Sequence, residues 1–176
     1  AGGDAMTTLA AIEAAATRMA GHVRQTPLLN APLLDRLAGR RVLVKAECLQ
    51  VTGSFKARGG WAAVSALPPG AGVLAMSSGN HAQGVAFAAA AHGVPAVILM
   101  PSDAPAVKIA NTRAYGAEVV LYDRATEDRD ALAARLSADR GLVLVPPFDH
   151  PEVIAGQGTV GLEIAEQAAM AGVQQA

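Results

Sequence analysis

The sequence predicts an α/β fold in which a parallel sheet carries helices on both faces. Four short apolar runs lie between residues 73 and 145, and a helical segment separates each run from the next. Each run together with its helix takes roughly 20–25 residues, which is the size of a βαβ repeat. The runs are continuously apolar, and this pattern is typical of strands buried on both faces of a parallel sheet.

The segment before this repeat predicts shorter elements. Thr7 or Thr8 can cap a first helix that runs to about Ala20, where Gly21 ends it. Pro27 requires an extended residue before it, which favours a loop. The other elements expected here are a loop over 22–30, a short helix over 32–38 that Gly39 ends, a strand over 41–47 and a helix over 57–65.

The repeat and the C-terminal segment predict the remaining elements. Strands are expected at 73–76, 96–100, 118–122 and 142–145, with helices at 83–92, 107–115 and 127–140 between them. The last of these helices carries Leu132 and Leu136 on one face and meets Gly141 as a stop. Pro146 and Pro147 then break the pattern. A turn or short helix at 149–155 and an amphipathic helix at 158–171 are expected after them.

Composition argues against several classes of function. The 176 residues carry a net charge of −1, so the chain lacks the basic footprint of a nucleic-acid-binding protein. An aromatic content of 3% also leaves few side chains for base stacking. None of the apolar runs reaches the length needed to span a membrane. Charged residues make up only 16%, below the usual quarter, which indicates much buried surface or a place in a larger assembly.

Cysteine and histidine do not form a metal-binding pattern. The single Cys48 rules out an internal disulfide and a cysteine-based zinc cluster, and it fits a reducing cytoplasm. The histidines at 22, 92 and 150 stand alone, without metal-ligand spacing. The first residues show no basic region followed by an apolar core, so no signal peptide is expected. We therefore expect a cytoplasmic protein that holds no metal.

The stretch Gly53-Ser54-Phe55-Lys56-Ala57-Arg58-Gly59-Gly60 joins a predicted strand to a predicted helix. An α/β fold exposes functional groups at such junctions. Only three of the 14 basic residues are Lys, so most of the solvated positive charge is carried by Arg. A lysine amine can lose its proton in a dry pocket and attack a carbonyl to form an imine, which makes Lys56 a candidate catalytic residue. An exposed lysine at a helix start is the structural alternative.

The stretch Ser77-Ser78-Gly79-Asn80-His81-Ala82-Gln83-Gly84 follows the next predicted strand and opens a helix. Its hydroxyl, amide and backbone N–H groups gather at a helix N-terminus, which is a ready anion site. An ordinary capped helix start, for which serine is common, is the structural alternative.

Together these motifs resemble those of the fold-type II pyridoxal-phosphate-dependent enzymes, which have a tryptophan synthase β-like fold. Within that family they are most similar to the serine/threonine dehydratase and serine racemase branch. The resemblance runs from Thr26 to Glu163, most of the chain, and depends on several motifs in the right order. The matching pieces are Lys45-Ala46-Glu47, Thr52 to Gly59, Ser77 to Gln83, Ala114-Tyr115-Gly116-Ala117 and Ala155-Gly156-Gln157-Gly158-Thr159.

The resemblance implies pyridoxal 5′-phosphate as the cofactor, bound covalently to Lys56 as a Schiff base. Phe55 would pack against the cofactor ring. Asn80 would hydrogen-bond to the phenolic oxygen of the cofactor, since an amide can donate without carrying charge. A core aromatic residue and a turn asparagine are the structural alternatives for these two positions.

The resemblance also implies that the second stretch binds the carboxylate of a small amino-acid substrate. The residues concerned are Ser77, Ser78, Gly79, Asn80 and His81. Gly79 allows close approach of the backbone, and His81 is expected to position the substrate rather than to act as a base. Lys56 would move the α-proton on one face, and Ser78 could act as a second acid/base on the opposite face. A serine occurs at that position in some dehydratases too.

These roles imply an ammonia-lyase (dehydratase) that converts a β-hydroxy amino acid such as threonine or serine into a 2-oxo acid and ammonia. A racemase on the same scaffold is an alternative that differs only in reprotonation from the opposite face. A β-replacement synthase would need a second, nucleophilic substrate. A half-protein that binds without turnover is the alternative from another functional class.

The resemblance implies two domains. Residues 60–147 would form a complete small parallel α/β domain, while 1–59, with the Schiff-base lysine, and 148–176 would belong to a larger one. The family continues past this length with more of the large domain and with a Gly-rich loop that cradles the cofactor phosphate. The chain is therefore expected to be an N-terminal portion of a homo-oligomeric enzyme.

Two further motifs are expected to be structural. The run Gly156-Gln157-Gly158-Thr159-Val160-Gly161 spells a dinucleotide-binding fingerprint, but it lacks a strand directly before it and an acidic residue about 20 positions on. Helix packing next to the active site is the role expected for it. Residues 127–130 are expected to form a solvated helix start.

Overall fold

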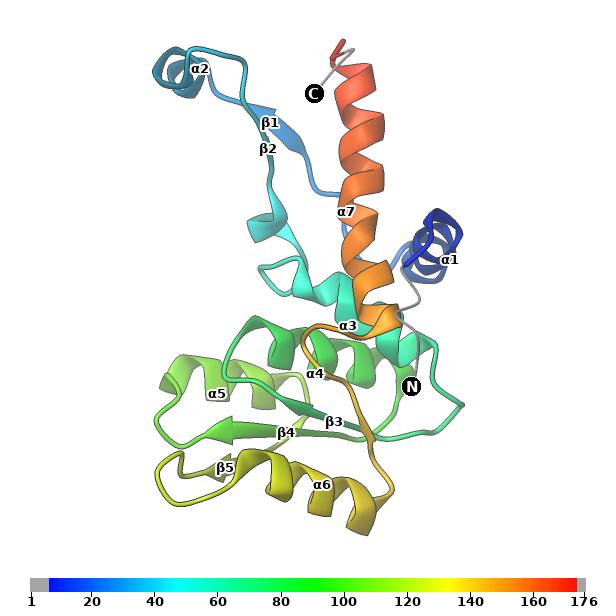
Figure 1. Ribbon diagram of the computed structural model, residues 1–176, viewed down its shortest axis with the longest axis vertical. Coiled ribbons are helices and arrows are strands. Elements are labelled where there is room, and N and C mark those ends of the chain that lie inside the picture. Colours follow the sequence, from blue (N-terminus) through cyan, green and yellow to red (C-terminus); the bar gives the residue numbers. More distant parts are fainter. Residues whose placement is uncertain (1–6, 174–176) are drawn as a thin grey trace.

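A four-stranded parallel sheet forms the lower half of the molecule (Figure 1). The structure is a computed structural model, and it describes residues 7–173. The strands β3 (Val73–Met76), β4 (Ala96–Pro101), β5 (Glu118–Tyr122) and β6 (Val143–Leu144) lie in the order β5-β4-β3-β6. All three pairings are parallel, and each strand ends within one residue of its expected bounds. The predicted parallel sheet is therefore confirmed.

Helices cover both faces of this sheet, as expected from its continuously apolar strands (Figure 1). On one face lie α4 (Asn80–His92) and α5 (Ala106–Ala114), and on the other lies α6 (Arg129–Arg140). Alternate residues of β3 and β4 enter two separate cores. Ala75 and Ile98 pack toward α4, whereas Leu74 and Leu99 pack toward α6.

Three helices form a further layer above α4. They are α1 (Leu9–Met19), α3 (Lys56–Ser65) and α7 (Pro151–Met170). The hydroxyl of Thr8 caps α1 by accepting a hydrogen bond from the N–H of Ala11 at 3.2 Å, as the sequence predicts. None of the helices within 7–173 combines the length and the apolarity required to cross a lipid bilayer.

An arm projects beyond this layer beside α7 (Figure 1). It consists of β1 (Leu28–Asn30), α2 (Pro32–Ala38), β2 (Leu43–Lys45) and the 3-10 helix η1 (Glu47–Leu49). The prediction of a loop over 22–30 is wrong at its C-terminal end, because Leu28–Asn30 is a strand that pairs antiparallel with β2. The extended backbone around Pro27 suits a strand as well as a loop, and the Pro27 carbonyl accepts from the N–H of Ala46 at 3.0 Å.

The two C-terminal segments expected at 149–155 and 158–171 are one continuous helix, α7. Its glycines lie where other helices approach closely. A Cβ at Gly156 would lie 2.6 Å from the carbonyl oxygen of Arg58, and one at Gly158 would lie 2.8 Å from Ile12. Contact with α3 and α1 therefore outweighs the low helix propensity of glycine. The GxGxxG run is a helix-packing motif, as expected.

Helices α3 and α4 contact each other closely at a pair of glycines, Gly60 and Gly84. A Cβ at Gly60 would lie 2.6 Å from the backbone of Gly84, and a Cβ at Gly84 would lie 2.4 Å from the carbonyl oxygen of Lys56. Real side chains do not approach a backbone this closely, so both positions require glycine. The contact holds the first turn of α3 against the first turns of α4.

We predict that Gly84→Ala destabilises the fold by about 1–3 kcal/mol, because the added methyl group overpacks against the Lys56 carbonyl. Urea unfolding measures the change. Gly161→Ala is the matched control, since Gly161 is exposed in α7 and a Cβ there meets nothing within 4 Å. That variant is expected to be more stable by roughly 0.5–1 kcal/mol, from helix propensity alone. Equal effects of the two substitutions would contradict the packing argument.

Candidate active site

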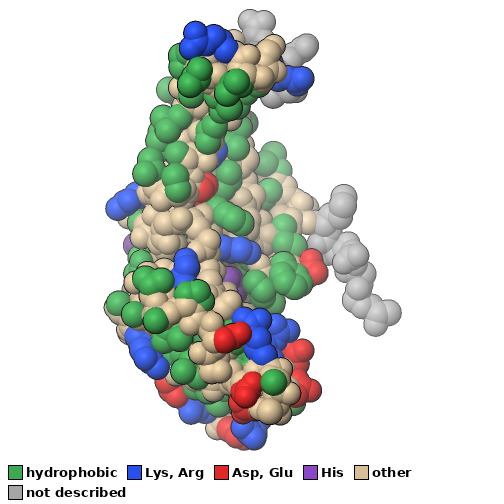
Figure 2. All heavy atoms as spheres, turned by 90° about the vertical axis from the view of Figure 1, so that its left-hand side faces the viewer, with side chains coloured by type: hydrophobic (Ala, Val, Ile, Leu, Met, Phe, Trp, Pro, Cys, Tyr) green, Lys and Arg blue, Asp and Glu red, His purple; other side chains and the backbone are tan. Residues whose placement is uncertain are grey.

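The candidate site lies at the edge where the parallel strands end. Because all four strands run in the same direction, the loops that follow them meet at one edge, and ligands of open α/β sheets bind there. Figure 2 looks onto this edge. It shows histidine and basic side chains below the arm and a mixed group of basic and acidic side chains lower down.

Lys56 is the first residue of α3, and its amine points to this edge. The amine donates a hydrogen bond to the carbonyl oxygen of Pro147 at 2.6 Å and lies 5.3 Å from the centre of the Phe55 ring. Burial lowers the pKa of Lys56 below its ordinary value. A lysine in this state is more readily deprotonated and hence more nucleophilic than one in solvent.

The loop after β3 leads directly into α4. The N–H of Ser77 donates to Leu99 at 3.2 Å and so continues the sheet, while the hydroxyl of Ser77 accepts from the N–H of Gly79 at 3.1 Å. Helix α4 begins at Asn80, three residues before the expected start at 83. The N–H groups of its first turn, including those of Asn80 and His81, have no acceptor within the helix. This turn therefore offers the free N–H groups with which helix N-termini bind anions.

His81 is buried at the base of this turn, with 3% of its surface exposed. Its Nε2 lies 2.9 Å from the carbonyl oxygen of Val145 and must donate to it, which leaves Nδ1 without a proton. Burial, together with the nearby charge of Lys56, lowers the pKa of His81 to about 4, although the bond to Val145 opposes the shift. His81 is thus held neutral by its burial, and its expected role in positioning the substrate stays a prediction.

The segment 145–150 brings Lys56 and His81 together. It accepts from Lys56 at Pro147 and from His81 at Val145. The N–H of Val145 in turn donates to Leu74 at 2.8 Å, which fixes the segment to β3. Nδ1 of His81 and Nδ1 of His150 are buried and have no hydrogen-bond partner in the part of the chain that the structure describes.

Asn80 and Lys108 form a contact that the sequence did not indicate. The side-chain oxygen of Asn80 accepts from the amine of Lys108 on α5 at 3.2 Å. This bond assigns the orientation of the amide, because the oxygen faces Lys108 and the NH₂ group is left as a donor. The predicted role of Asn80 requires such a donor.

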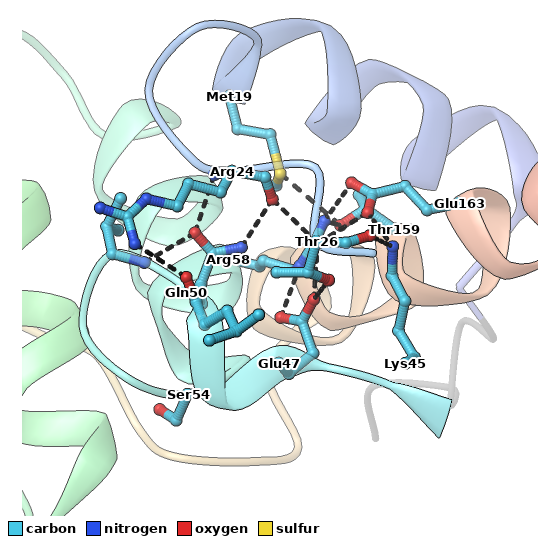
Figure 3. A network of polar contacts seen from close by, with 12 residues as sticks. Met19, Arg24, Thr26, Lys45, Glu47, Gln50, Ser54, Arg58, Thr159 and Glu163 are labelled. Atoms are coloured by element: carbon cyan, nitrogen blue, oxygen red, sulfur yellow. Dashed lines mark hydrogen bonds and ion pairs between the residues drawn. The ribbon is translucent and has the colours of Figure 1, made fainter. Parts of the chain in front are cut away.

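A buried ion-pair network surrounds Arg58, which follows Lys56 by two residues in α3 (Figure 3). Arg58 is fully buried and forms two hydrogen bonds with each of two carboxylates, at 2.7 and 2.9 Å to Glu47 and at 2.6 and 2.9 Å to Glu163. Burial alone would lower the pKa of Arg58, but both carboxylates raise it, so the guanidinium stays charged. Burial would raise the pKa of Glu47, yet hydrogen bonds from Arg58 and Thr26 bring it below the ordinary value.

The network continues to the arm through Lys45. Its amine donates to Glu163 at 2.5 Å, to the carbonyl of Thr26 at 2.6 Å and to Gln167 at 2.9 Å. Because Glu163 also binds Arg58, the network as a whole joins β2, α3 and α7 (Figure 3). Sequence reasoning missed the network, although charged residues within the short strand at 41–47 and the lone Arg in a Gly- and Ala-rich helix were signals for it.

Ser77 and Ser78 also line a cavity that sequence reasoning missed. Its other lining residues include Arg124 and Arg129. The start of α6 was expected to be solvated, and Asp128 does cap it, accepting from the N–H groups of Asp130 and Ala131 at 2.9 and 3.1 Å. Arg129, however, faces the same cavity as the serine loop.

A parallel sheet with a desolvated amine and a helix N-terminus at its carboxyl edge is the arrangement in which open α/β folds bind small anionic ligands. A family model described as "Pyridoxal-phosphate dependent enzyme" matches residues 19–173. The chain belongs to this family, which confirms the resemblance.

The names of individual relatives indicate two kinds of activity, ammonia-lyase and racemase. The chain is 50% identical over 155 residues to an L-threo-3-hydroxyaspartate ammonia-lyase of a Pseudomonas species, covering 86% of this chain and 49% of the relative. It is 42% identical to the serine racemase of Schizosaccharomyces pombe, covering 89% of this chain and 49% of the relative. The chain thus spans about half the length of these relatives.

Solved structures agree with the fold. A threonine deaminase from T.th. superposes with a TM-score of 0.88 at 52% identity, covering 94% of this chain and 53% of that one. Maize serine racemase superposes with a TM-score of 0.89 at 37% identity, covering 93% of this chain and 50% of that one. The fold-type II assignment is confirmed.

We predict that His81 does not titrate near neutral pH. With a pKa of about 4, the buried ring is neutral above that value, whereas a solvated histidine protonates near 6.5. The folded-state pKa lies below the unfolded one, so the stability that the neutral ring contributes is complete above pH 6.5 and falls as the pH drops toward 4. An NMR titration of the histidine ring protons measures this. A His81 midpoint near 6.5 would contradict the assignment.

Proposed function

We propose that this chain provides the lysine and the substrate-binding turn of a pyridoxal-phosphate-dependent ammonia-lyase. The reaction converts a β-hydroxy amino acid, such as threonine or serine, into a 2-oxo acid and ammonia. One observation carries the proposal: the amine of Lys56 has a lowered pKa, and both it and His81, in the first turn of α4, bond to the short segment 145–147. Membership of the family and the names of the relatives support it.

The residues present suit the cofactor. Lys56 would bind its aldehyde covalently, the Phe55 ring lies beside that amine, and the NH₂ group of Asn80 is free to donate to a phenolic oxygen. The side-chain oxygen and nitrogen of Gln157 are buried and lack partners within 7–173, as does Nδ1 of His150. Buried polar groups are normally hydrogen-bonded, so these atoms are suited to a polar ligand. When bound, the cofactor supplies an electron sink for the substrate carbanion.

The chain's own residues would orient the substrate and move its protons. The first turn of α4 and the hydroxyls of Ser77 and Ser78 would bind the α-carboxylate of the substrate. Lys56 would take the proton from the α-carbon, and the β-hydroxyl would leave as water. In the segment 145–150, the carbonyl of Pro147 binds the amine of Lys56 and the carbonyl of Val145 binds the neutral ring of His81. A second positive charge next to the amine is thereby avoided.

A racemase remains the second candidate, because serine racemases are among the relatives and Ser78 lies on the predicted loop. The two activities share every step up to removal of the α-proton. They differ in whether the β-hydroxyl leaves or a proton returns from the opposite face. Ser78 is the residue that we propose for that second proton transfer.

We also retain the division into a small domain at 60–147 and parts of a larger one at 1–59 and 148–176. The four-stranded sheet with α4, α5 and α6 falls within the first range, which supports this proposal. We further propose a homo-oligomeric enzyme in the cytoplasm, where the free, exposed Cys48 would stay reduced.

We predict that pyridoxal phosphate forms a reducible imine with Lys56 of this chain. Borohydride reduction followed by peptide mass spectrometry locates the label among the three lysines. Label is expected on Lys56 and to be absent from the Lys56→Arg variant, while Lys45, buried in its ion pairs, and Lys108 stay unmodified. Label on Lys108, or unchanged labelling of the variant, would remove the assignment.

We predict that the cofactor-loaded protein releases a 2-oxo acid and ammonia from L-threonine or L-serine. Coupled detection of the keto acid measures the lyase, and chiral chromatography measures any D-serine. D-serine without keto acid would instead identify a racemase, and its loss in Ser78→Ala would support the proton role of that hydroxyl. Imine formation without either product would support the alternative of a chain that binds without turnover.

A further inference from the structure

Lys108 lies on α5, close to the turn that begins α4. The two helices follow adjacent parallel strands, β3 and β4, so both begin at the same edge of the sheet. The side chain of Lys108 is half-buried, and its amine donates to the side-chain oxygen of Asn80 at 3.2 Å. Its backbone is fixed on both sides. The N–H donates to the carbonyl of Pro105 at 2.8 Å, and the carbonyl accepts from the hydroxyl of the fully buried Thr112 at 2.8 Å.

The partner of Lys108 differs from those of the other two lysines. Lys45 is paired with the carboxylate of Glu163, and Lys56 is bonded to a backbone carbonyl. Lys108 forms no ion pair with a carboxylate within residues 7–173. Its amine is bonded instead to a neutral amide at the edge of the sheet where the candidate site lies.

This bond selects one of the two orientations of the Asn80 amide. An asparagine side chain can present either its oxygen or its NH₂ group to a ligand, but an ammonium group only donates and can bind the oxygen alone. The NH₂ group of Asn80 is therefore turned away from Lys108. A positive charge on the oxygen side also polarises the amide, which strengthens the N–H groups as donors.

We infer that Lys108 is a positioning residue for the cofactor and acts through Asn80. The inference rests on the proposed function, in which the NH₂ group of Asn80 donates to the phenolic oxygen of pyridoxal phosphate. Lys108 holds that donor in the orientation that the phenolic oxygen requires. Because Lys108 acts through Asn80, its effect disappears when either Asn80 or the phenolic oxygen is removed.

A cofactor analogue without the phenolic oxygen tests this directly. Lys108→Met is expected to weaken the binding of pyridoxal phosphate by about 3- to 10-fold, the effect of impairing one hydrogen bond. The same substitution is expected to leave unchanged the binding of 3-deoxypyridoxal phosphate, which keeps the aldehyde and the phosphate. Absorbance titration of the 176-residue chain measures both dissociation constants. Equal weakening of both ligands, or of neither, would overturn the inference.

A double-mutant cycle shows whether Lys108 and Asn80 act as one unit. Asn80→Ala is expected to weaken pyridoxal phosphate binding at least as much as Lys108→Met does. The double variant is expected to bind no more weakly than Asn80→Ala alone, whereas independent residues would give additive losses. Lys108→Arg restores a donor for the amide oxygen and is expected to recover most of the affinity. Additive losses would overturn the inference.

Arg113→Met is the matched control. Arg113 is exposed near the end of the same helix, so the substitution also removes one positive charge from α5. It is expected to leave the binding of pyridoxal phosphate unchanged. A loss as large as that in Lys108→Met would assign the effect to net charge and overturn the inference.

The side-chain amide of Asn80 gives a readout that needs no cofactor. In a nitrogen–proton NMR spectrum of the unloaded chain, its NH₂ signals are expected to shift in Lys108→Met and to stay in place in Arg113→Met. Unchanged signals in Lys108→Met would overturn the inference. Labelling of Lys56 is measured separately, so shifted amide signals in a chain that takes no label would contradict the proposed function alone.

Discussion

The backbone contact between Lys56 and Gly84 determines the geometry of the candidate site. A side chain at either Gly60 or Gly84 would separate α3 from α4, because each Cβ would lie within 2.6 Å of the other helix's backbone. Without that contact the amine of Lys56 would have no fixed relation to the anion-binding turn. The glycines therefore cost some helix propensity, but they allow the first turns of α3 and α4, which come from separate segments, to lie side by side.

The Arg58 network holds the same helix from the other side. Arg58 lies two residues after Lys56, and its carboxylate partners come from η1 and α7. Burying these charges adds little net stability, because desolvation offsets much of the attraction, but any single partner left alone would be strongly destabilising. The network therefore favours one arrangement of the arm, α3 and α7 over others. The network thus acts on which packing arrangement forms rather than on overall stability, and it leaves the start of α3 little freedom to shift.

The sequence predicted the sheet closely, because continuous apolar runs and glycine stops are local signals. The prediction failed where contacts between segments distant in the sequence determine the secondary structure. Leu28–Asn30 is too short to be recognised as a strand without its partner β2, and the low helix propensity of Gly156 and Gly158 concealed the continuity of α7. Lys56 and the serine turn were found through their motifs. Arg124 and Arg129 were not, because only the strand order β5-β4-β3-β6 places them beside Ser78.

The charge of the side chains changes along this edge of the sheet. At the β6 side lies an amine of lowered pKa, which can exist uncharged and so accept a covalent partner. The middle holds the N–H groups that begin α4, beside an imidazole that is neutral and so presents no second full charge to the amine. At the β5 side lie two guanidinium groups, those of Arg124 and Arg129. Charge along the edge therefore rises from the β6 side, where burial disfavours the charged amine, to the β5 side, where two guanidinium groups line the same cavity as Ser77 and Ser78.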